Sequence, residues 1–114
     1  MSFIPYPHIE RIGKEDAEGI VAGDCYIFPK LDGTNSSLWM EDGKLKGGSR
    51  NRELSTEKDN AGFYSASLAD EKYIKFFEKY PQYVLYGEWL VPHTFKKYRE
   101  NSWRKFYVFD VFKK

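Results

Sequence analysis

Four short stretches of this sequence combine residue types that can do chemistry on phosphate groups. The first reads Lys-Leu-Asp-Gly-Thr-Asn and begins at Lys30, with the carboxylate of Asp32 two residues later and Gly33 forming the turn. A lysine amine that is held rigidly and uncharged can attack phosphorus or a carbonyl carbon. The short pattern also occurs by chance, so a surface lysine before a tight turn is the alternative.

Two further stretches offer contacts for a ligand. Residues 47 to 52 read Gly-Gly-Ser-Arg-Asn-Arg, in which the glycines let the backbone approach a ligand and Arg50 and Arg52 present guanidinium groups to phosphate or ribose oxygens. A solvated loop would explain them equally well. Glu88 stands in the apolar run 86 to 90, where a carboxylate is costly unless it accepts hydrogen bonds or holds a ligand hydroxyl. An ion pair inside the core is the alternative for Glu88.

The fourth stretch, Phe-Tyr-Val-Phe-Asp-Val at residues 106 to 111, ends close to the last residue of the sequence. An aromatic ring such as Phe109 can stack on a base, and Asp110 can meet a metal ion or a lysine. Taken alone, the run is also typical of a buried strand. Each stretch is therefore weak evidence by itself, and their order and spacing carry the information.

The elements around the first two stretches are predicted to be strands. The β-prone run Cys25 to Phe28 is closed by Pro29, which lacks a backbone donor, so Lys30 is expected at a strand-to-turn junction. Asp42-Gly43 favours a hairpin that joins strands over Ser36 to Met40 and Lys44 to Gly48. Residues 49 to 65 are polar and are expected to form a loop.

A helix and two strands are predicted to follow. The helix is expected over Leu68 to Tyr80, started by Ser67 and stopped by Pro81. The strands are expected over Tyr83 to Leu90 and Lys105 to Phe112. Alternation places Val84, Tyr86 and Glu88 on one face of the first strand, and it places Phe109 and Asp110 on opposite faces of the second. Residues 1 to 23 are expected to be an irregular lead-in with one helical turn near Lys14 to Glu18.

Together these elements predict an α+β fold, a mostly antiparallel β-sheet with a packed helix. The 114 residues suffice for one domain. The net charge is +1, so binding to nucleic acid must depend on local basic patches. A lone Cys25 cannot form an internal disulfide or a thiolate zinc site. No signal peptide or membrane span is evident, so we expect a cytoplasmic protein without membrane contact.

In this order, the four stretches resemble the nucleotidyltransferase motifs of the ATP-dependent RNA ligase family, closest to the branch that seals nicks in duplex RNA and to its phage relatives. The strings KLDGTN, GSRNR, YGEWLVPHT and FYVFDV carry the resemblance and span Lys30 to Val111. It implies part of the nucleotidyltransferase (ATP-grasp-like) ligase fold, with a nucleotide cleft between sheets and Lys30 at its floor. It also implies ATP and Mg²⁺ as cofactors.

The resemblance further implies a three-step reaction. Lys30 attacks the α-phosphate of ATP, expels pyrophosphate and becomes lysyl-AMP. AMP then passes to an RNA 5′-phosphate, and a 3′-hydroxyl displaces it to seal the strand. Phosphoryl transfer of this kind depends mainly on positioning and on stabilising charge, which suits cations and a divalent metal around the triphosphate.

Roles for individual residues follow from the resemblance by matching position. Asp32 and Gly33 would shape the turn of Lys30, and Arg50 would contact ribose or the nicked strand. Glu88 would hold ribose hydroxyls, Phe109 would stack on adenine, and Asp110 beside it would meet the metal. Basic residues of two loops are expected to face RNA phosphates, with a solvated polar face as the alternative: Arg52, Lys96, Lys97 and Arg99, and with them Lys44, Lys46, Arg104 and Lys105.

The sequence departs from the family pattern in its distal part. An acidic motif of the form E-G-hydrophobic-V and a K-x-K motif would follow the aromatic stretch, and neither stands there; Pro29 replaces an acid that often precedes the nucleophile. Residues 1–114 are thus expected to be a partial adenylyltransferase domain that a second chain or segment completes, with weak or no adenylylation on its own. The alternatives are a non-catalytic nucleotide- or RNA-binding module with this fold, and a DNA ligase or capping-type nucleotidyltransferase.

Overall fold

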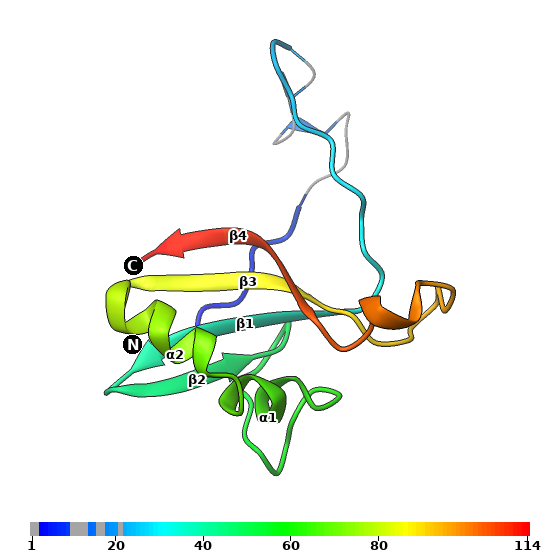
Figure 1. The fold of residues 1–114 in the computed structure, drawn as a ribbon. Coiled ribbons are helices and arrows are strands. Elements are labelled where there is room, and N and C mark those ends of the chain that lie inside the picture. The colour runs from blue at the N-terminus through cyan, green and yellow to red at the C-terminus, as the bar shows by residue number, and fades with distance from the viewer. Residues whose placement is uncertain (1–2, 10–13, 16–17, 21) are drawn as a thin grey trace.

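A four-stranded antiparallel sheet, with two helices on one of its faces, forms the centre of the computed structural model (Figure 1). The structure describes residues 3–9, 14–15, 18–20 and 22–114. The strands have the spatial order β2-β1-β3-β4, so that β2 and β4 form the edges. Their bounds are β1 Thr34–Glu41, β2 Lys44–Gly48, β3 Tyr83–Trp89 and β4 Phe106–Lys113. The helices are α1 Phe63–Leu68, α2 Glu71–Lys79 and the short 3-10 helix η2 Glu100–Ser102. This arrangement confirms the predicted α+β class.

The predicted hairpin is confirmed between β1 and β2. Glu41 pairs with Lys44, and the two turn residues Asp42 and Gly43 have φ values of 52° and 74°. Positive φ at both positions belongs to the tight turn whose twist matches that of the flanking strands, and Asp-Gly is among its preferred pairs.

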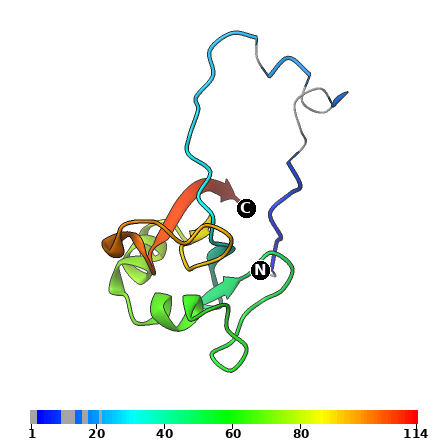
Figure 2. The ribbon, with the colours of Figure 1, turned by 90° about the vertical axis from the view of Figure 1, so that its right-hand side faces the viewer.

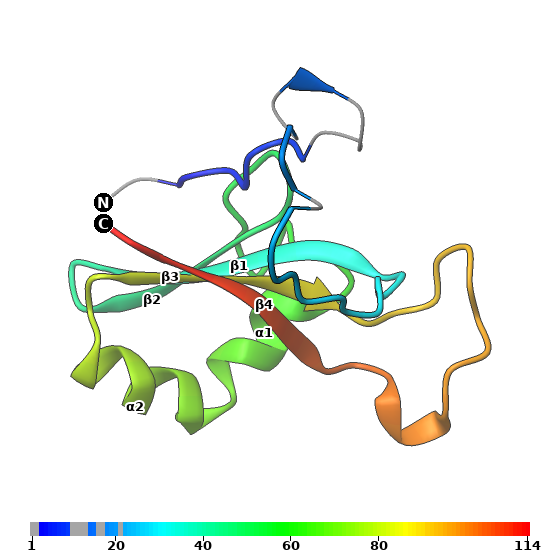
Figure 3. The same ribbon diagram turned by 90° about the horizontal axis from the view of Figure 1, so that it is seen from above.

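Each face of the sheet packs its own apolar cluster, as the predicted alternation in β3 requires. Leu85 and Trp89 face α1 and α2 and pack with Phe63 and Phe77 in the main core. Val84 and Tyr86 point to the other face, where Phe3 and Tyr6 of the N-terminal segment cover them together with Trp39. Figure 3 shows this segment on one side of the sheet and the helices on the other.

The predicted single helix over Leu68 to Tyr80 is wrong at its beginning. The Ser67 hydroxyl donates to the Phe63 carbonyl (2.8 Å) inside α1, and Asp70 is the residue that caps α2 by accepting from the Lys72 amide (3.1 Å). The first half of helix α1 lies within the predicted loop. It is held by the Asp59 carboxylate, which accepts from the amides of Tyr64 (2.8 Å) and Ser65 (2.9 Å).

The strand predicted over Cys25 to Phe28 is also wrong. This segment runs outside the sheet, and Tyr26, Ile27 and Phe28 are 87%, 91% and 78% exposed. A β-prone sequence forms a strand only where another strand offers its backbone, and none among the described residues lies beside this segment. The helical turn predicted near Lys14 to Glu18 lies partly outside the described residues. No helix in the described part of the chain is long and apolar enough to cross a membrane.

Candidate active site

The turn that follows Lys30 is held against strand β3. Thr34 and Asn35, at the beginning of β1, pair with Trp89 and Glu88, so the antiparallel register brings the first and third stretches together. The Gly33 amide donates to Oε2 of Glu88 (3.0 Å). A Cβ atom on Gly33 would stand 2.3 Å from the Trp89 carbonyl oxygen, so the fit between the two backbones requires glycine here.

Glu88 thus has a hydrogen-bonded environment. It is partly buried on the face of the sheet that carries Val84 and Tyr86, and within the described part of the chain it forms no ion pair. Its Oε1 atom accepts no hydrogen bond from the described residues. One carboxylate oxygen therefore fixes the turn, and the other is able to accept from a ligand hydroxyl.

A second set of contacts fastens the same turn to the connection between β3 and β4. Oδ2 of Asp32 accepts from the Phe95 amide (2.6 Å), Oδ1 lies 3.1 Å from Nδ1 of His93, and the Asp32 amide donates to the Tyr98 hydroxyl (3.0 Å). The hydrogen bond from Phe95, aided by His93, holds the pKa of Asp32 below its usual value. Asp32 therefore shapes the turn, and it does so through residues more than 60 positions away.

Phe109 and Asp110 come to the same face through an irregularity in β4. Asp110 pairs with Tyr86 and Val108 pairs with Gly87, so Phe109 is an extra residue opposite the Tyr86-Gly87 step. The Tyr6 ring packs edge-on against Phe109 (5.2 Å between centroids), and the Tyr6 hydroxyl donates to Oδ2 of Asp110 (2.8 Å). The prediction that Phe109 and Asp110 lie on opposite faces is therefore wrong, because a bulge interrupts strand alternation.

The contact with Tyr6 has an electrostatic consequence. Burial, together with the hydrogen bond to Asp110 and its negative charge, raises the pKa of Tyr6 to about 12. The Tyr6 hydroxyl is therefore protonated at neutral pH and donates to the Asp110 carboxylate. The neighbouring Phe109 keeps 51% of its surface exposed. A half-exposed ring beside a carboxylate can stack on a flat ligand.

The arginines of the second stretch have different surroundings. Arg50 is exposed and forms no hydrogen bond with the described residues, whereas the Arg52 guanidinium donates to the carbonyls of Lys58 (2.7 Å) and Asp59 (3.0 Å). Arg52 would have to give up both bonds to reach RNA. Gly48 pairs with Ser37, so the loop that carries Arg50 leaves the sheet at the end where β1 begins.

The predicted residues are brought together to different degrees. Asp32, Gly33 and Glu88 are joined directly, and Phe109 and Asp110 lie on the same face of the sheet as Glu88. Lys30 is exposed and forms no hydrogen bond or ion pair within the described part of the chain. The described strands form one sheet, so the cleft expected between two sheets is not formed by these residues.

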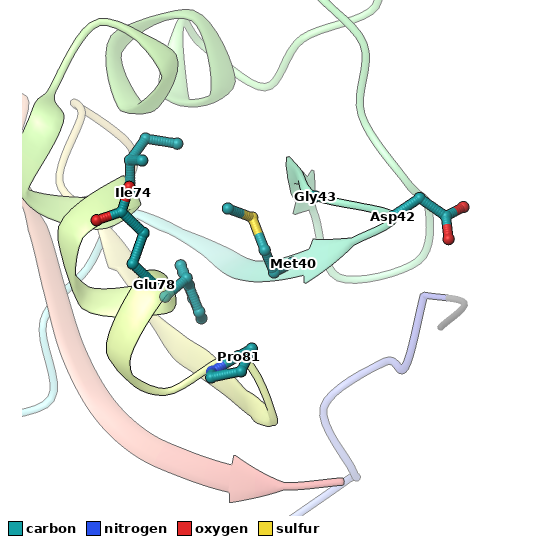
Figure 4. A pocket seen from close by; sticks show the side chains of 7 residues that line it. Met40, Asp42, Gly43, Ile74, Glu78 and Pro81 are labelled. Carbon is teal, nitrogen blue, oxygen red and sulfur yellow. The ribbon is translucent and has the colours of Figure 1, made fainter.

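A groove of about 450 Å³ lies on the opposite face, between the β1–β2 hairpin and α2 (Figure 4). The lining residues are Met40, Asp42, Gly43, Ile74, Phe77, Glu78 and Pro81, none of which belongs to the four stretches. Met40 points from the strand toward α2 in the figure. This groove is therefore a feature of the helix-covered face, separate from the site around Glu88.

The carboxylates near the site set limits on a metal. No three His, Cys, Asp or Glu side chains among the described residues are placed to hold an ion together. Magnesium is commonly bound through one or two carboxylates and the phosphate oxygens of the substrate. Asp110 fits that smaller role, because among the described residues its two oxygens accept only from Tyr6 and from the Val111 amide (2.8 Å).

Sequence reasoning missed His93 and Tyr98. Both lie in a polar connection whose conformation cannot be read from hydrophobic periodicity. Their contacts with Asp32 join residues that are far apart in the sequence, so they arise only when the chain folds.

The sequence model of a protein family described as RNA ligase matches residues 23–114, which include all four stretches. The sequence matches no curated protein.

Proposed function

Because this chain belongs to the RNA ligase family, we propose that it takes part in the ATP-dependent joining of RNA ends, with Lys30 as the residue that carries AMP. The observation that carries the proposal is the hydrogen bond between Gly33 and Glu88. It links the turn of the nucleophile to a carboxylate that has one oxygen left for a ribose hydroxyl. The residues that the resemblance assigns to the nucleophile turn and to ribose binding are therefore in direct contact.

In the first step, Nζ of Lys30 attacks the α-phosphorus of ATP. A phosphorus–nitrogen bond forms, the bond to the bridging oxygen of pyrophosphate breaks, and the amine loses its proton to solvent. Glu88 accepts from a ribose hydroxyl and Phe109 stacks on adenine, so both fix the nucleotide relative to the Lys30 turn. Asp110 would hold magnesium together with phosphate oxygens, and the ion would supply charge that neutralises the triphosphate.

In the next two steps, the RNA ends react in turn. A 5′-phosphate oxygen attacks the phosphorus of lysyl-AMP and releases the amine, which gives an adenylylated RNA end. A 3′-hydroxyl then attacks the 5′-phosphate phosphorus and expels AMP, which forms the new phosphodiester. Arg50, which is exposed at the end of the sheet where β1 begins, is proposed to contact the ribose or the phosphates of the RNA.

We further propose that residues 1–114 are a partial adenylyltransferase domain. Val108, Val111 and Phe112 on the edge strand β4 are 44%, 49% and 47% exposed. An apolar edge strand of this kind is an attachment site for another strand. A further polypeptide segment, from this chain or a second one, would cover it and supply the missing acidic and lysine motifs.

Peptide-mapped mass spectrometry after incubation with ATP and magnesium tests the proposal. Weak addition of AMP at Lys30, or none, is expected from these residues alone, and the Lys30→Arg variant should carry none. Rapid and complete modification would contradict the partial-domain proposal. AMP on a lysine other than Lys30 would contradict the nucleophile assignment.

A second candidate is a nucleotide- or RNA-binding module without catalysis. The observation that favours it is the exposed position of Lys30, which touches neither Glu88 nor Phe109 among the described contacts. A Lys30→Ala variant separates the two candidates, because it abolishes adenylylation in the first and leaves RNA binding intact in the second. The family match favours RNA over DNA as the substrate.

A further inference from the structure

The connection between β3 and β4, residues 92–105, forms an arm that projects beyond the end of the sheet (Figure 3) and lies toward the viewer when the sheet is seen from that end (Figure 2). It concentrates positive charge in a chain whose net charge is only +1. Glu100 is its single acidic residue, against five basic residues that are all exposed: Lys96, Lys97, Arg99, Arg104 and Lys105. The arm is therefore a local basic patch in a chain that is nearly neutral overall.

The arm has a small aromatic core of its own. Phe95 packs on Tyr98 with 4.7 Å between ring centroids, and Tyr98 packs on Trp103 at 5.3 Å. The Tyr107 hydroxyl on β4 donates to the Ser102 carbonyl (3.0 Å). Tyr98 and Trp103 are partly buried, whereas Phe95 keeps 46% of its surface exposed. The packed rings order the arm before any ligand binds, which lowers the entropy cost of binding.

Three cations of the arm are available for a partner. Within the described part of the chain, Lys96, Lys97 and Arg99 form no ion pair and no side-chain hydrogen bond. Arg104 differs, because its guanidinium lies over the Trp89 ring (5.5 Å). The free cations follow Phe95 directly in the sequence, so charge and an aromatic surface occur together.

The arm is also fastened to the candidate active site. The Phe95 amide and His93 hold the Asp32 carboxylate, and the Tyr98 hydroxyl accepts from the Asp32 amide. Lys30 lies two residues before Asp32. A ligand bound to the arm is therefore connected to the nucleophile turn by three short contacts.

We propose that this arm binds single-stranded RNA, with one base stacked on Phe95 and backbone phosphates on Lys96, Lys97 and Arg99. Single-stranded nucleic acid is recognised by aromatic rings that stack on exposed bases beside cations that follow the backbone. A duplex keeps its bases stacked and leaves no use for the Phe95 ring. The proposal rests on the proposed function insofar as RNA is the partner, and it adds where the strand enters the site.

Fluorescence anisotropy with a labelled single-stranded RNA of about 12 nucleotides and the matching duplex, without ATP, tests the arm over a range of salt concentrations. Each phosphate contact contributes about 0.7 to the slope of log affinity against log salt for single strands, so the variant Lys96→Ala/Lys97→Ala/Arg99→Ala should lose about 2 units of slope. Phe95→Ala should weaken single-strand binding at least about fivefold at an unchanged slope.

The matched control is Lys72→Ala/Lys75→Ala/Lys79→Ala, which removes three exposed cations from α2 and should change neither quantity. Thermal unfolding of each variant checks that the fold is kept. The proposal is overturned if the wild-type chain binds no single-stranded RNA, if the arm and control variants behave alike, or if duplex binds equally well and independently of Phe95. Displacement of RNA by poly-glutamate at equal charge concentration would also overturn it, because the arm would then be a surface for acidic proteins.

The assay separates this proposal from the proposed function. Arm-dependent binding with AMP on a lysine other than Lys30 would refute the proposed nucleophile and leave the arm in place, whereas AMP on Lys30 with arm-independent binding would refute the arm alone.

Discussion

Replacing Gly33 by alanine tests whether the nucleophile turn depends on close contact with β3. The added Cβ would meet three backbone atoms, the Trp89 carbonyl oxygen at 2.3 Å and the Trp89 carbonyl carbon and Leu90 Cα at 3.0 Å. Backbone at the paired ends of β1 and β3 cannot move aside as the end of a flexible side chain can. The substitution must therefore separate β1 from β3 locally and weaken the hydrogen bond from Gly33 to Glu88.

The expected cost comes from overpacking and from that hydrogen bond. Overpacking against a rigid neighbour costs about 1–3 kcal/mol and a weakened hydrogen bond about 1 kcal/mol, so Gly33→Ala should lower the free energy of unfolding by about 3 kcal/mol. Gly43→Ala is the control, because Gly43 has φ 74° and no atom within 4 Å of the added Cβ, so only backbone strain of about 1 kcal/mol arises.

Urea unfolding monitored by tryptophan fluorescence measures both variants. The control should also keep whatever AMP addition the wild-type chain shows, while Gly33→Ala should lose it. Equal destabilisation by the two substitutions, or normal adenylylation of Gly33→Ala, would refute the role assigned to this contact.

Three other predictions concern groups that support the site. Asp59→Asn should destabilise α1, because hydrogen bonds from the amides of Ser65 and Tyr64 outweigh the effect of burial and lower the pKa of Asp59. The stabilisation by Asp59 is therefore present above its unfolded pKa of about 4 and is lost as pH falls through the folded pKa, so urea midpoints should fall less in the variant between pH 7 and pH 2. Tyr6→Phe should lower the free energy of unfolding by about 1 kcal/mol, because the hydrogen bond to Asp110 is lost. Since the pKa of Tyr6 is raised from 10 to about 12, this stabilisation is present below pH 10 and is lost as pH rises toward 12, so wild type and variant should converge in stability in alkaline unfolding experiments. Arg52→Ala should destabilise the chain more than Arg50→Ala, because only Arg52 braces two loop carbonyls; equal thermal midpoints would contradict this.

Local patterns predicted the parts of the fold that local chemistry decides. Asp42-Gly43 specifies its own turn, and the alternation of β3 separates Val84 and Tyr86 from Leu85 and Trp89 because each set packs on a different face. The sequence pattern places the beginning of α2 three residues early, since Ser67 and Asp70 are both good capping residues and only the packed structure shows which one is used.

The remaining features depend on contacts between distant residues. The bulge that brings Asp110 to the face of Glu88 has no marker in the sequence of β4, and the strand expected at Cys25 to Phe28 lacks a described partner strand. The motifs identified Asp32 as a turn residue, but its contacts with His93 and Tyr98 arise only when the arm folds against the turn.

Amide chemical-shift mapping during an ATP titration with magnesium tests whether the face around Glu88 binds the nucleotide. We expect saturable shifts at Gly33, Glu88 and Phe109, which a Glu88→Ala variant loses while the exposed α2 control Glu71→Ala keeps them. Shifts that centre instead on Met40 and Glu78 in the groove of the opposite face, or a Glu88→Ala variant that binds ATP as the wild type does, would contradict it.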